Sequence, residues 1–142
     1  MTLLAKDEKR LEVIGEGLRE ARETLARLDL REWEARLVYD RAVDYLGMTA
    51  DLYLRARHLP RSDSAKRRLT DVILDLRRLG VRDLPAEEDV FEEIDERNAS
   101  VHDGSITRST RLQAGLTEQN ARTLLRAVRG VLIPGAPRDG AG

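Results

Sequence analysis

The sequence predicts an all-α fold, a bundle of four to five up-and-down helices joined by short connections. Apolar residues recur at spacings of three and four along most of the 142-residue chain, which is the period of an amphipathic helix. No stretch alternates apolar and polar residues in the way that a half-buried strand does. The length fits one domain, which we expect over residues 1–133, followed by a disordered tail rich in Gly and Pro over 134–142.

The first two helices are predicted from their apolar stripes. The first stripe is interrupted by Gly15 and Gly17 and consists of Leu11, Ile14, Leu18, Ala21, Leu25 and Leu28. The segment 29–32 has the composition of a capping box, so we expect one helix to stop there and the next to start. Pro60 ends the second helix because proline has no amide donor. The second stripe consists of Trp33, Leu37, Val38, Ala42, Tyr45, Thr49, Leu52 and Ala56.

Two shorter helices are predicted next. The segment 62–64 supplies capping side chains for a third helix, and Gly80 ends it. Pro85 opens a fourth helix whose first turn is acidic, as the helix dipole favours. The third helix presents Leu69, Val72, Ile73, Leu76 and Leu79 to the core, and the fourth presents Val90, Phe91, Ile94 and Val101.

The last predicted helix begins at Thr117, which has the side chain of an N-cap residue. Its apolar positions are Leu124, Ala127, Val128 and Val131. Turn-forming residues dominate positions 104–115, where we expect a loop or a short helix.

Composition excludes several classes of protein. The absence of cysteine removes disulfide scaffolds, thiol catalysis and Cys-ligated metal centres. One Trp, three Tyr and one Phe are too few for a base-stacking platform, and the net charge of −1 argues against a generally basic nucleic-acid coat. No apolar run approaches the about 20 residues of a membrane span, and the start of the chain has no signal-peptide core. We therefore expect a cytoplasmic protein that does not enter the membrane.

Charge is distributed unevenly along the chain. Residues 53–82 hold nine basic and three acidic side chains, whereas residues 83–103 hold nine acidic side chains and one basic one, Arg97. One interpretation is that complementary helix faces form surface ion pairs. The other is a rim that attracts RNA phosphates, composed of Arg55, Arg57, Arg61, Lys66, Arg67, Arg68, Arg108 and Arg111.

The segment 96–104 holds the one group of residues that indicates chemistry. Arg97 offers a permanent cation whose planar fork fits phosphate oxygens, and His102 can take and give a proton near neutral pH. Asn98 can orient either of them, and Glu93 or Glu96 can orient Arg97. Such a set is sufficient for RNA cleavage without metal, in which the histidine deprotonates the ribose 2′-OH and the arginine stabilises the phosphorane charge.

This segment, Arg97-Asn98-x-x-x-His102, resembles the R-x4-6-H signature of the HEPN superfamily. The resemblance implies a four- or five-helix bundle in which Arg97 and His102 are catalytic and Asn98 supports them. It also implies a homodimer that acts on RNA without a metal or other cofactor. A setting in toxin–antitoxin or anti-phage defence, with a cognate antitoxin or defence-system partner, follows from the same resemblance.

Helix geometry constrains the two catalytic candidates. At about 100° per residue, Arg97 and His102 lie about 140° apart on a continuous helix and do not share a face. Either the helix breaks near Ser100, or each arginine serves a site shared with a second subunit, as the paired motifs of HEPN dimers imply.

Purely structural interpretations of these residues also stay open. Arg97 can pair with Glu93 on an exposed acidic helix, and His102 can be an ordinary residue at a helix end. His58, the other histidine, fits a surface or capping role, and Trp33 fits the core or a dimer interface. The spacing of the acidic residues near the motif matches no known metal-binding pattern. The whole chain then fits a non-catalytic HEPN-like module that binds nucleotide, RNA or protein, or a helical interaction protein that dimerises through its first two helices.

Overall fold

The computed structural model describes residues 3–86, 88, 90–92, 94–95 and 110–134. Four long helices have defined bounds: α1 (Ala5–Leu25), α2 (Glu32–Ala56), α3 (Ala65–Arg78) and α5 (Thr110–Leu132). The described residues between 88 and 95 are helical as well, and no strand occurs in the described part of the chain. The all-α helical bundle predicted from the periodicity is therefore confirmed. No helix among the described residues is long and apolar enough to cross a membrane.

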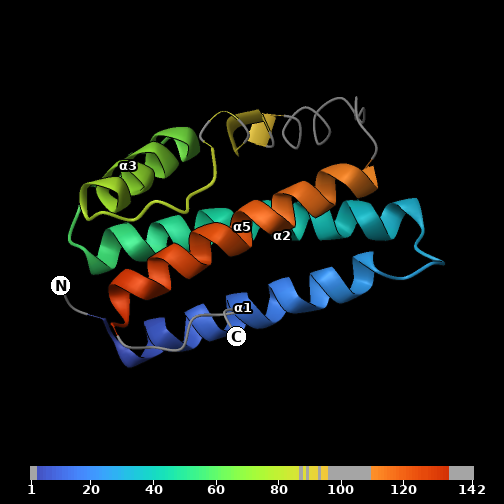
Figure 1. Cartoon of the computed structure of the whole chain (residues 1–142), viewed down its shortest axis with the longest axis horizontal. Helices are drawn as coiled ribbons and strands as arrows, with labels where there is room; N and C mark the ends of the chain where they lie inside the picture. The colour runs from blue at the N-terminus through green and yellow to red at the C-terminus, as the bar shows by residue number, and fades with distance from the viewer. Residues whose placement is uncertain (1–2, 87, 89, 93, 96–109, 135–142) are drawn as a thin grey trace.

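The helices pack around α2 (Figure 1). α1 runs antiparallel to α2, whereas α5 runs in the same direction as α2 and makes with it the most extensive contact in the molecule. α3 packs on the C-terminal half of α2, and the helical residues after Pro85 lie farther along the same side of the bundle. Because α5 runs parallel to α2, the chain between α3 and α5 returns to the end of the bundle where α2 begins.

The burial pattern of α2 follows from its central position. In its first half the buried residues form a stripe, which includes Val38, Ala42 and Leu46. Over 49–56 the buried set extends around most of the circumference, because α3 joins α1 and α5 there. Tyr39 and Tyr53 are among the largest fully buried side chains, so these two tyrosines belong to the core.

The α1 stripe is confirmed from Leu11 to Ala21, and Leu25 packs on it from the edge. Leu28 was expected to continue the stripe, and that prediction is wrong: its side chain is 100% exposed. The helix ends at Leu25, three residues too early for Leu28 to occupy the next position on the buried face.

The glycines of α1 have a packing role. A Cβ atom on Gly17 would overlap the ring of Tyr45 on α2, and a Cβ atom on Gly15 would touch Leu125 on α5 at 3.6 Å. Gly17 therefore lets α1 approach α2 closely at a position where any other residue would displace Tyr45.

The start of α2 differs in detail from the prediction. The N-cap is Arg31, and Glu34 closes the first turn by accepting the Arg31 backbone N–H at 3.2 Å. Arg27 bridges Asp29 and Glu34, so the connection is held by side chains rather than by a box over 29–32. Trp33 is 63% exposed and Leu37 is 44% exposed, so in this chain neither lies in the core.

Both ends of α3 agree with the sequence. Ser64 is the N-cap, and its hydroxyl accepts the backbone N–H of Arg67 at 3.3 Å. Gly80 follows the C-cap with φ of 89°, and the N–H of Val81 bonds to the carbonyl of Leu76, which completes a Schellman motif. The end of α2 uses the same motif, with His58 in the left-handed position at φ of 57°. His58 is exposed, which fits the capping role expected for it.

The segment after Pro85 also agrees where it is described. Val90 and Ile94 are buried and belong to the hydrophobic core. Phe91 is only partly buried, and the Lys66 ammonium lies 6.0 Å from its ring centroid. Val101, the fourth residue predicted to face the core here, lies outside the described residues.

The last helix begins earlier than predicted. α5 starts by Thr110, so the described part of 104–115 is helix, and Thr117 lies inside it. The Thr117 hydroxyl donates to the carbonyl of Gln113, four residues back, at 2.8 Å and is fully buried. Thr117 is therefore a core position of α5 rather than its cap, because a buried threonine can satisfy its hydroxyl within its own helix.

Replacing Gly17 tests the close approach of α1 to α2. We expect Gly17→Ala to lower the free energy of unfolding by about 1–2 kcal/mol, because the Tyr45 ring must move. In a Tyr45→Ala background the same change should raise it by about 0.5–1 kcal/mol, since alanine favours helix over glycine. Urea denaturation of the four proteins measures both effects.

Gly47→Ala is the matched control, since a Cβ atom on this glycine of α2 meets nothing within 4 Å. It should stabilise the protein in either background. An equal effect of Gly17→Ala with and without the Tyr45 ring would contradict the packing role given to Gly17.

Candidate functional site

The proposed catalytic residues Arg97, Asn98 and His102 lie outside the described residues, as do Glu93, Glu96 and Arg108. The structure does describe the two residues that precede this segment, Ile94 and Asp95. Ile94 is buried against the core, and the Asp95 carboxylate lies 2.7 Å from the Lys66 ammonium at the start of α3. The helix that leads into the motif is therefore anchored against the N-terminal end of α3.

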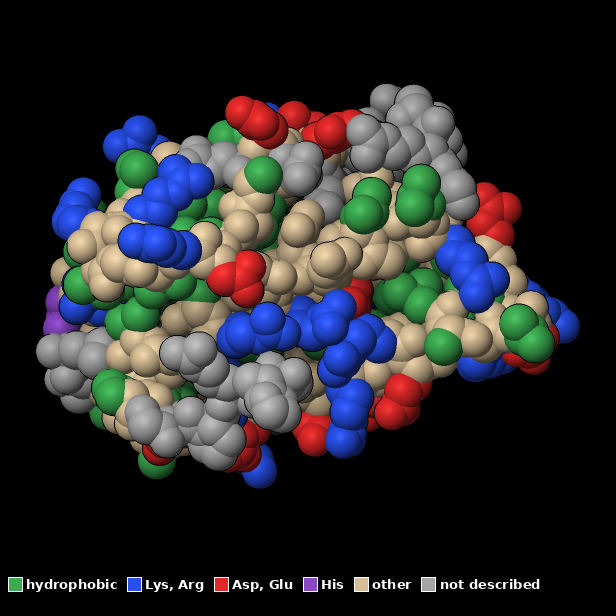
Figure 2. All heavy atoms as spheres, in the orientation of Figure 1, with side chains coloured by type: hydrophobic (Ala, Val, Ile, Leu, Met, Phe, Trp, Pro, Cys, Tyr) green, Lys and Arg blue, Asp and Glu red, His purple; other side chains and the backbone are tan. Residues whose placement is uncertain are grey.

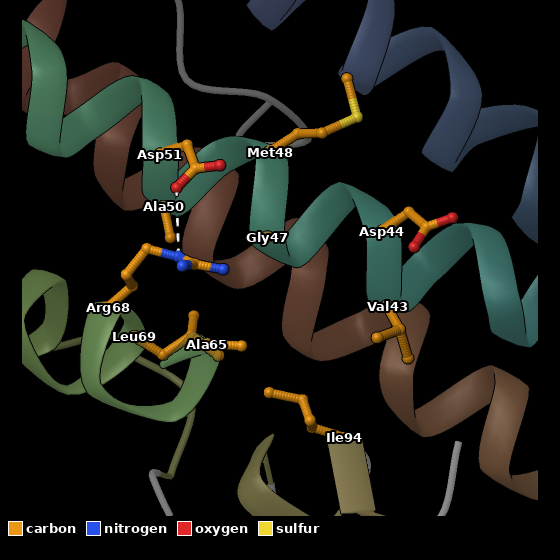
Figure 3. Close-up of a pocket in the computed structure, with 10 residues that line it drawn as sticks. All are labelled: Val43, Asp44, Gly47, Met48, Ala50, Asp51, Ala65, Arg68, Leu69 and Ile94. Carbon is orange, nitrogen blue, oxygen red and sulfur yellow. Dashed lines mark ion pairs between the residues drawn. The ribbon is translucent and has the colours of Figure 1, made fainter. Parts of the chain in front are cut away.

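A cavity of about 470 Å³ lies where this helix meets α2 and α3 (Figure 3). Ile94 points toward it from the segment after Pro85, and Gly47 leaves the facing surface of α2 without a side chain. At one end Arg68 of α3 faces Asp51 of α2, with Nε and Oδ1 3.2 Å apart. Its volume falls in the range of small-molecule sites, and its lining combines apolar residues with one cation and two carboxylates. The residues that line it are Val43, Asp44, Gly47, Met48, Ala50, Asp51, Ala65, Arg68, Leu69 and Ile94.

The structure brings together part of the predicted phosphate-binding rim near this cavity. Arg61 and Arg68 share the Asp51 carboxylate, at 3.1 and 3.2 Å. Lys66 pairs with Asp95, as described above, and Arg67 pairs with Asp71 on α3 at 3.2 Å. Each of these four cations therefore has a carboxylate partner within the chain.

The remaining described members of the rim lie apart and hold the fold together. Arg55 binds the buried Asp7 of α1 at 2.8 Å. Arg111 donates to the backbone carbonyls of Leu25 and Arg27 at 2.7 and 3.1 Å, and so caps the C-terminal end of α1. These contacts support the interpretation as ion pairs and helix caps, and RNA binding by the rim stays a prediction.

Arg57, the last of these, belongs to a buried polar cluster between α2 and α3. Its Nε donates to Oδ2 of Asp75 at 2.9 Å, and the Tyr53 hydroxyl donates to the same oxygen. Burial works to raise the pKa of Asp75, but the hydrogen bonds from Arg57 and Tyr53 outweigh it and hold that pKa below its ordinary value of 3.8. Burial and the adjacent carboxylate raise the pKa of Tyr53, so the phenol stays protonated and donates. These hydrogen bonds hold α3 against the C-terminal end of α2.

The structure also reveals basic residues that the sequence analysis did not single out. Arg122, Arg126 and Arg129 occupy one face of α5 at positions i, i+4 and i+7. Arg22 of α1 and Arg122 both contact the buried Glu118, at 3.2 and 3.3 Å. Burial raises the pKa of Glu118, and the two arginines oppose that shift. The spacing of the three arginines is visible in the sequence, but residues 53–82 have the larger local excess of basic side chains.

Neither a metal-binding cluster among the described residues nor a similar protein was found that would inform the site. No three His, Asp or Glu side chains in the described ranges lie close enough together to hold a metal ion. Comparisons of the chain with protein-family models, with curated proteins and with solved structures found no match.

The pKa of Asp75 makes a pH-dependent prediction. A carboxylate whose pKa is lowered by folding stabilises the folded state above its unfolded pKa, and this contribution disappears as the pH falls through the folded pKa. We therefore expect the unfolding free energy to fall below about pH 4. Asp75→Asn should cost about 2 kcal/mol at pH 7, because buried donors lose their charged acceptor, and should flatten the acid limb.

Asp71→Asn is the matched control, because Asp71 makes an i,i+4 pair with the exposed Arg67 on the same helix. It should cost less than about 0.5 kcal/mol. Urea denaturation between pH 2.5 and 7 measures both proteins. An Asp75→Asn variant whose stability falls with acid as steeply as the wild type would show that Asp75 is not the titrating group.

Proposed function

We propose that this chain is a metal-independent endoribonuclease of the HEPN type that acts as a homodimer. The observation that carries the proposal is the segment Arg97-Asn98-x-x-x-His102, which follows directly on a helix anchored in the core by Ile94. An all-α bundle with the motif late in the chain is the setting that the resemblance implies.

The anchoring of this helix supports a catalytic use of the motif. Ile94 is three residues before Arg97 and faces the cavity between α2 and α3. The Asp95–Lys66 ion pair and the packing of Val90 hold the described residues before the motif against α3 and the core. A rigid element of this kind is what precise placement of catalytic side chains requires.

The chemistry assigns a role to each residue. His102 takes the proton from a ribose 2′-OH, and the resulting oxygen attacks the adjacent phosphorus. The bond from phosphorus to the 5′ oxygen breaks, and the proton held by His102 passes to that leaving oxygen. Arg97 stabilises the charge that builds on the phosphate oxygens, Asn98 positions the pair, and Glu93 or Glu96 orients Arg97. The products carry a 2′,3′-cyclic phosphate and a 5′-hydroxyl end.

The dimer supplies the geometry that one helix lacks. If residues 97–102 form a continuous helix, Arg97 and His102 are about 140° apart on it, and a site shared across a two-fold axis pairs the arginine of one copy with the histidine of the other. A helix break near Ser100 is the alternative within one copy. The biological setting that goes with this proposal is toxin–antitoxin or anti-phage defence in the cytoplasm, with a cognate antitoxin or defence partner.

A second candidate function is a non-catalytic HEPN-like module that binds nucleotide, RNA or a partner protein. The predicted rim does not favour it, since Arg61, Lys66 and Arg67 each have a carboxylate partner within the chain. The cavity between α2 and α3 offers a volume suited to a nucleotide-sized ligand.

Incubation of the purified protein with a mixed RNA pool in EDTA tests the proposal. We expect the wild type to cleave and to leave 2′,3′-cyclic phosphate ends. Arg97→Ala and His102→Ala should each lower the rate by at least about 100-fold, because general acid–base and charge-stabilising groups contribute factors of this size.

His58→Asn is the matched control, because His58 is the other histidine and asparagine tolerates its left-handed backbone. It should cleave as the wild type does. Absence of cleavage by all proteins, with RNA or nucleotide binding retained, would replace the nuclease with the non-catalytic module. Cleavage retained by both alanine variants would exclude the motif as the catalytic group.

A further inference from the structure

Within the described part of the chain, three arginines on α5 outnumber the carboxylates that pair with them. We call Arg122, Arg126 and Arg129 the α5 arginine row; all three are partly exposed. Figure 2 shows Lys and Arg side chains gathered along the seam between α5 and α1, near the middle of this face. Spacings of four and three residues give the row a length of about 10 Å along the helix axis.

Among the described residues, the arginines in this region outnumber the carboxylates that contact them. Arg22 of α1 joins the row at its start, so four arginines meet two carboxylates there, Glu118 and Asp83. The Asp83 contact to Arg126 is long, at 3.5 Å, and the Asp83 side chain is 76% exposed. The side chain of Arg129 makes no hydrogen bond or ion pair with the residues that the structure describes.

The Nε atoms of the three arginines share the same environment. Those of Arg122, Arg126 and Arg129 are all buried, and none has a hydrogen-bond partner. These buried Nε atoms cannot themselves reach a ligand, so a ligand would contact the exposed parts of the three partly exposed guanidinium side chains. The predicted rim differs at one point: every described cation there has a partner in the chain, whereas the Arg129 side chain of the row has none among the described residues.

We propose that the α5 arginine row binds the phosphate backbone of the RNA substrate. A row of about 10 Å is long enough to contact more than one phosphate along an RNA strand. Guanidinium groups suit phosphate oxygens because they offer a planar fork of donors. This inference rests on the proposed function, in that it assigns the substrate of the same protein to a surface outside the motif.

Fluorescence anisotropy with a labelled 20-nucleotide RNA tests this, using His102→Ala as the parent so that the probe stays intact. Arg126→Gln/Arg129→Gln should bind the RNA at least about 10-fold more weakly than the parent. Two lost phosphate contacts should also reduce the slope of log K against log salt by about 1.5. Inorganic phosphate at millimolar concentration should not displace the RNA, since a single phosphate meets only part of the row.

Arg19→Gln/Arg27→Gln is the matched control, because it removes the same charge from cations that are already paired and that belong neither to the row nor to the predicted rim. It should change affinity by less than about twofold. Asp83→Asn provides a gain: it frees Arg126 without touching the core and should tighten RNA binding by about two- to threefold. Circular dichroism confirms that each variant keeps its helices.

The outcomes separate this inference from the nuclease. An equal loss in the row variant and in the control, or no loss in the row variant, overturns the role of the row whatever the wild type does to RNA. Selective loss in the row variant, together with a wild type that never cleaves, supports the row and rejects the nuclease. A wild type that cleaves, with a row variant that binds and cleaves equally well, supports the nuclease and rejects the row.

Discussion

The structure depends on the packing of α1, α3 and α5 against α2. A helix surrounded in this way must be apolar around most of its circumference, and the C-terminal half of α2 is. The neighbours are fixed by specific contacts rather than by burial alone: Gly17 admits the Tyr45 ring between α1 and α2, and Asp75 of α3 is bound by Tyr53 and Arg57. The cavity beside Ile94 and the α5 arginine row both lie on the frame that these contacts hold.

Much of this frame could be predicted from the sequence, because apolar spacing and capping residues act locally. The stripe of α1, the Ser64 cap and the Gly80 stop of α3, and the burial of Val90 and Ile94 all agree with the pattern. The errors fall where tertiary context decides. Leu28 continues the period of α1 but lies beyond its end, and Thr117 resembles a cap but satisfies its hydroxyl inside a buried turn.

The candidate site shows the same division. Residue types predicted a phosphate-binding rim, but partners determine whether a cation is free, and the sequence does not show them. Arg55 lies 48 residues from its partner Asp7, and Arg57 lies 18 from Asp75. The α5 arginine row shows the converse: its spacing is visible in the sequence, but only the packed helices show that, among the described residues, its arginines outnumber their carboxylate partners. The motif Arg97-Asn98-x-x-x-His102 remains an inference from residue chemistry and resemblance.

Mixing two inactive variants tests most directly whether this bundle forms one RNA-cleaving cleft from two copies. Arg97→Ala and His102→Ala proteins are combined, allowed to exchange subunits, and assayed on RNA in EDTA while native mass spectrometry counts the mixed dimers. A cleft shared across the dimer regains about a quarter of wild-type cleavage, since half of the dimers are mixed and each holds one complete pair. Mixed dimers that form and stay inactive would contradict the shared cleft.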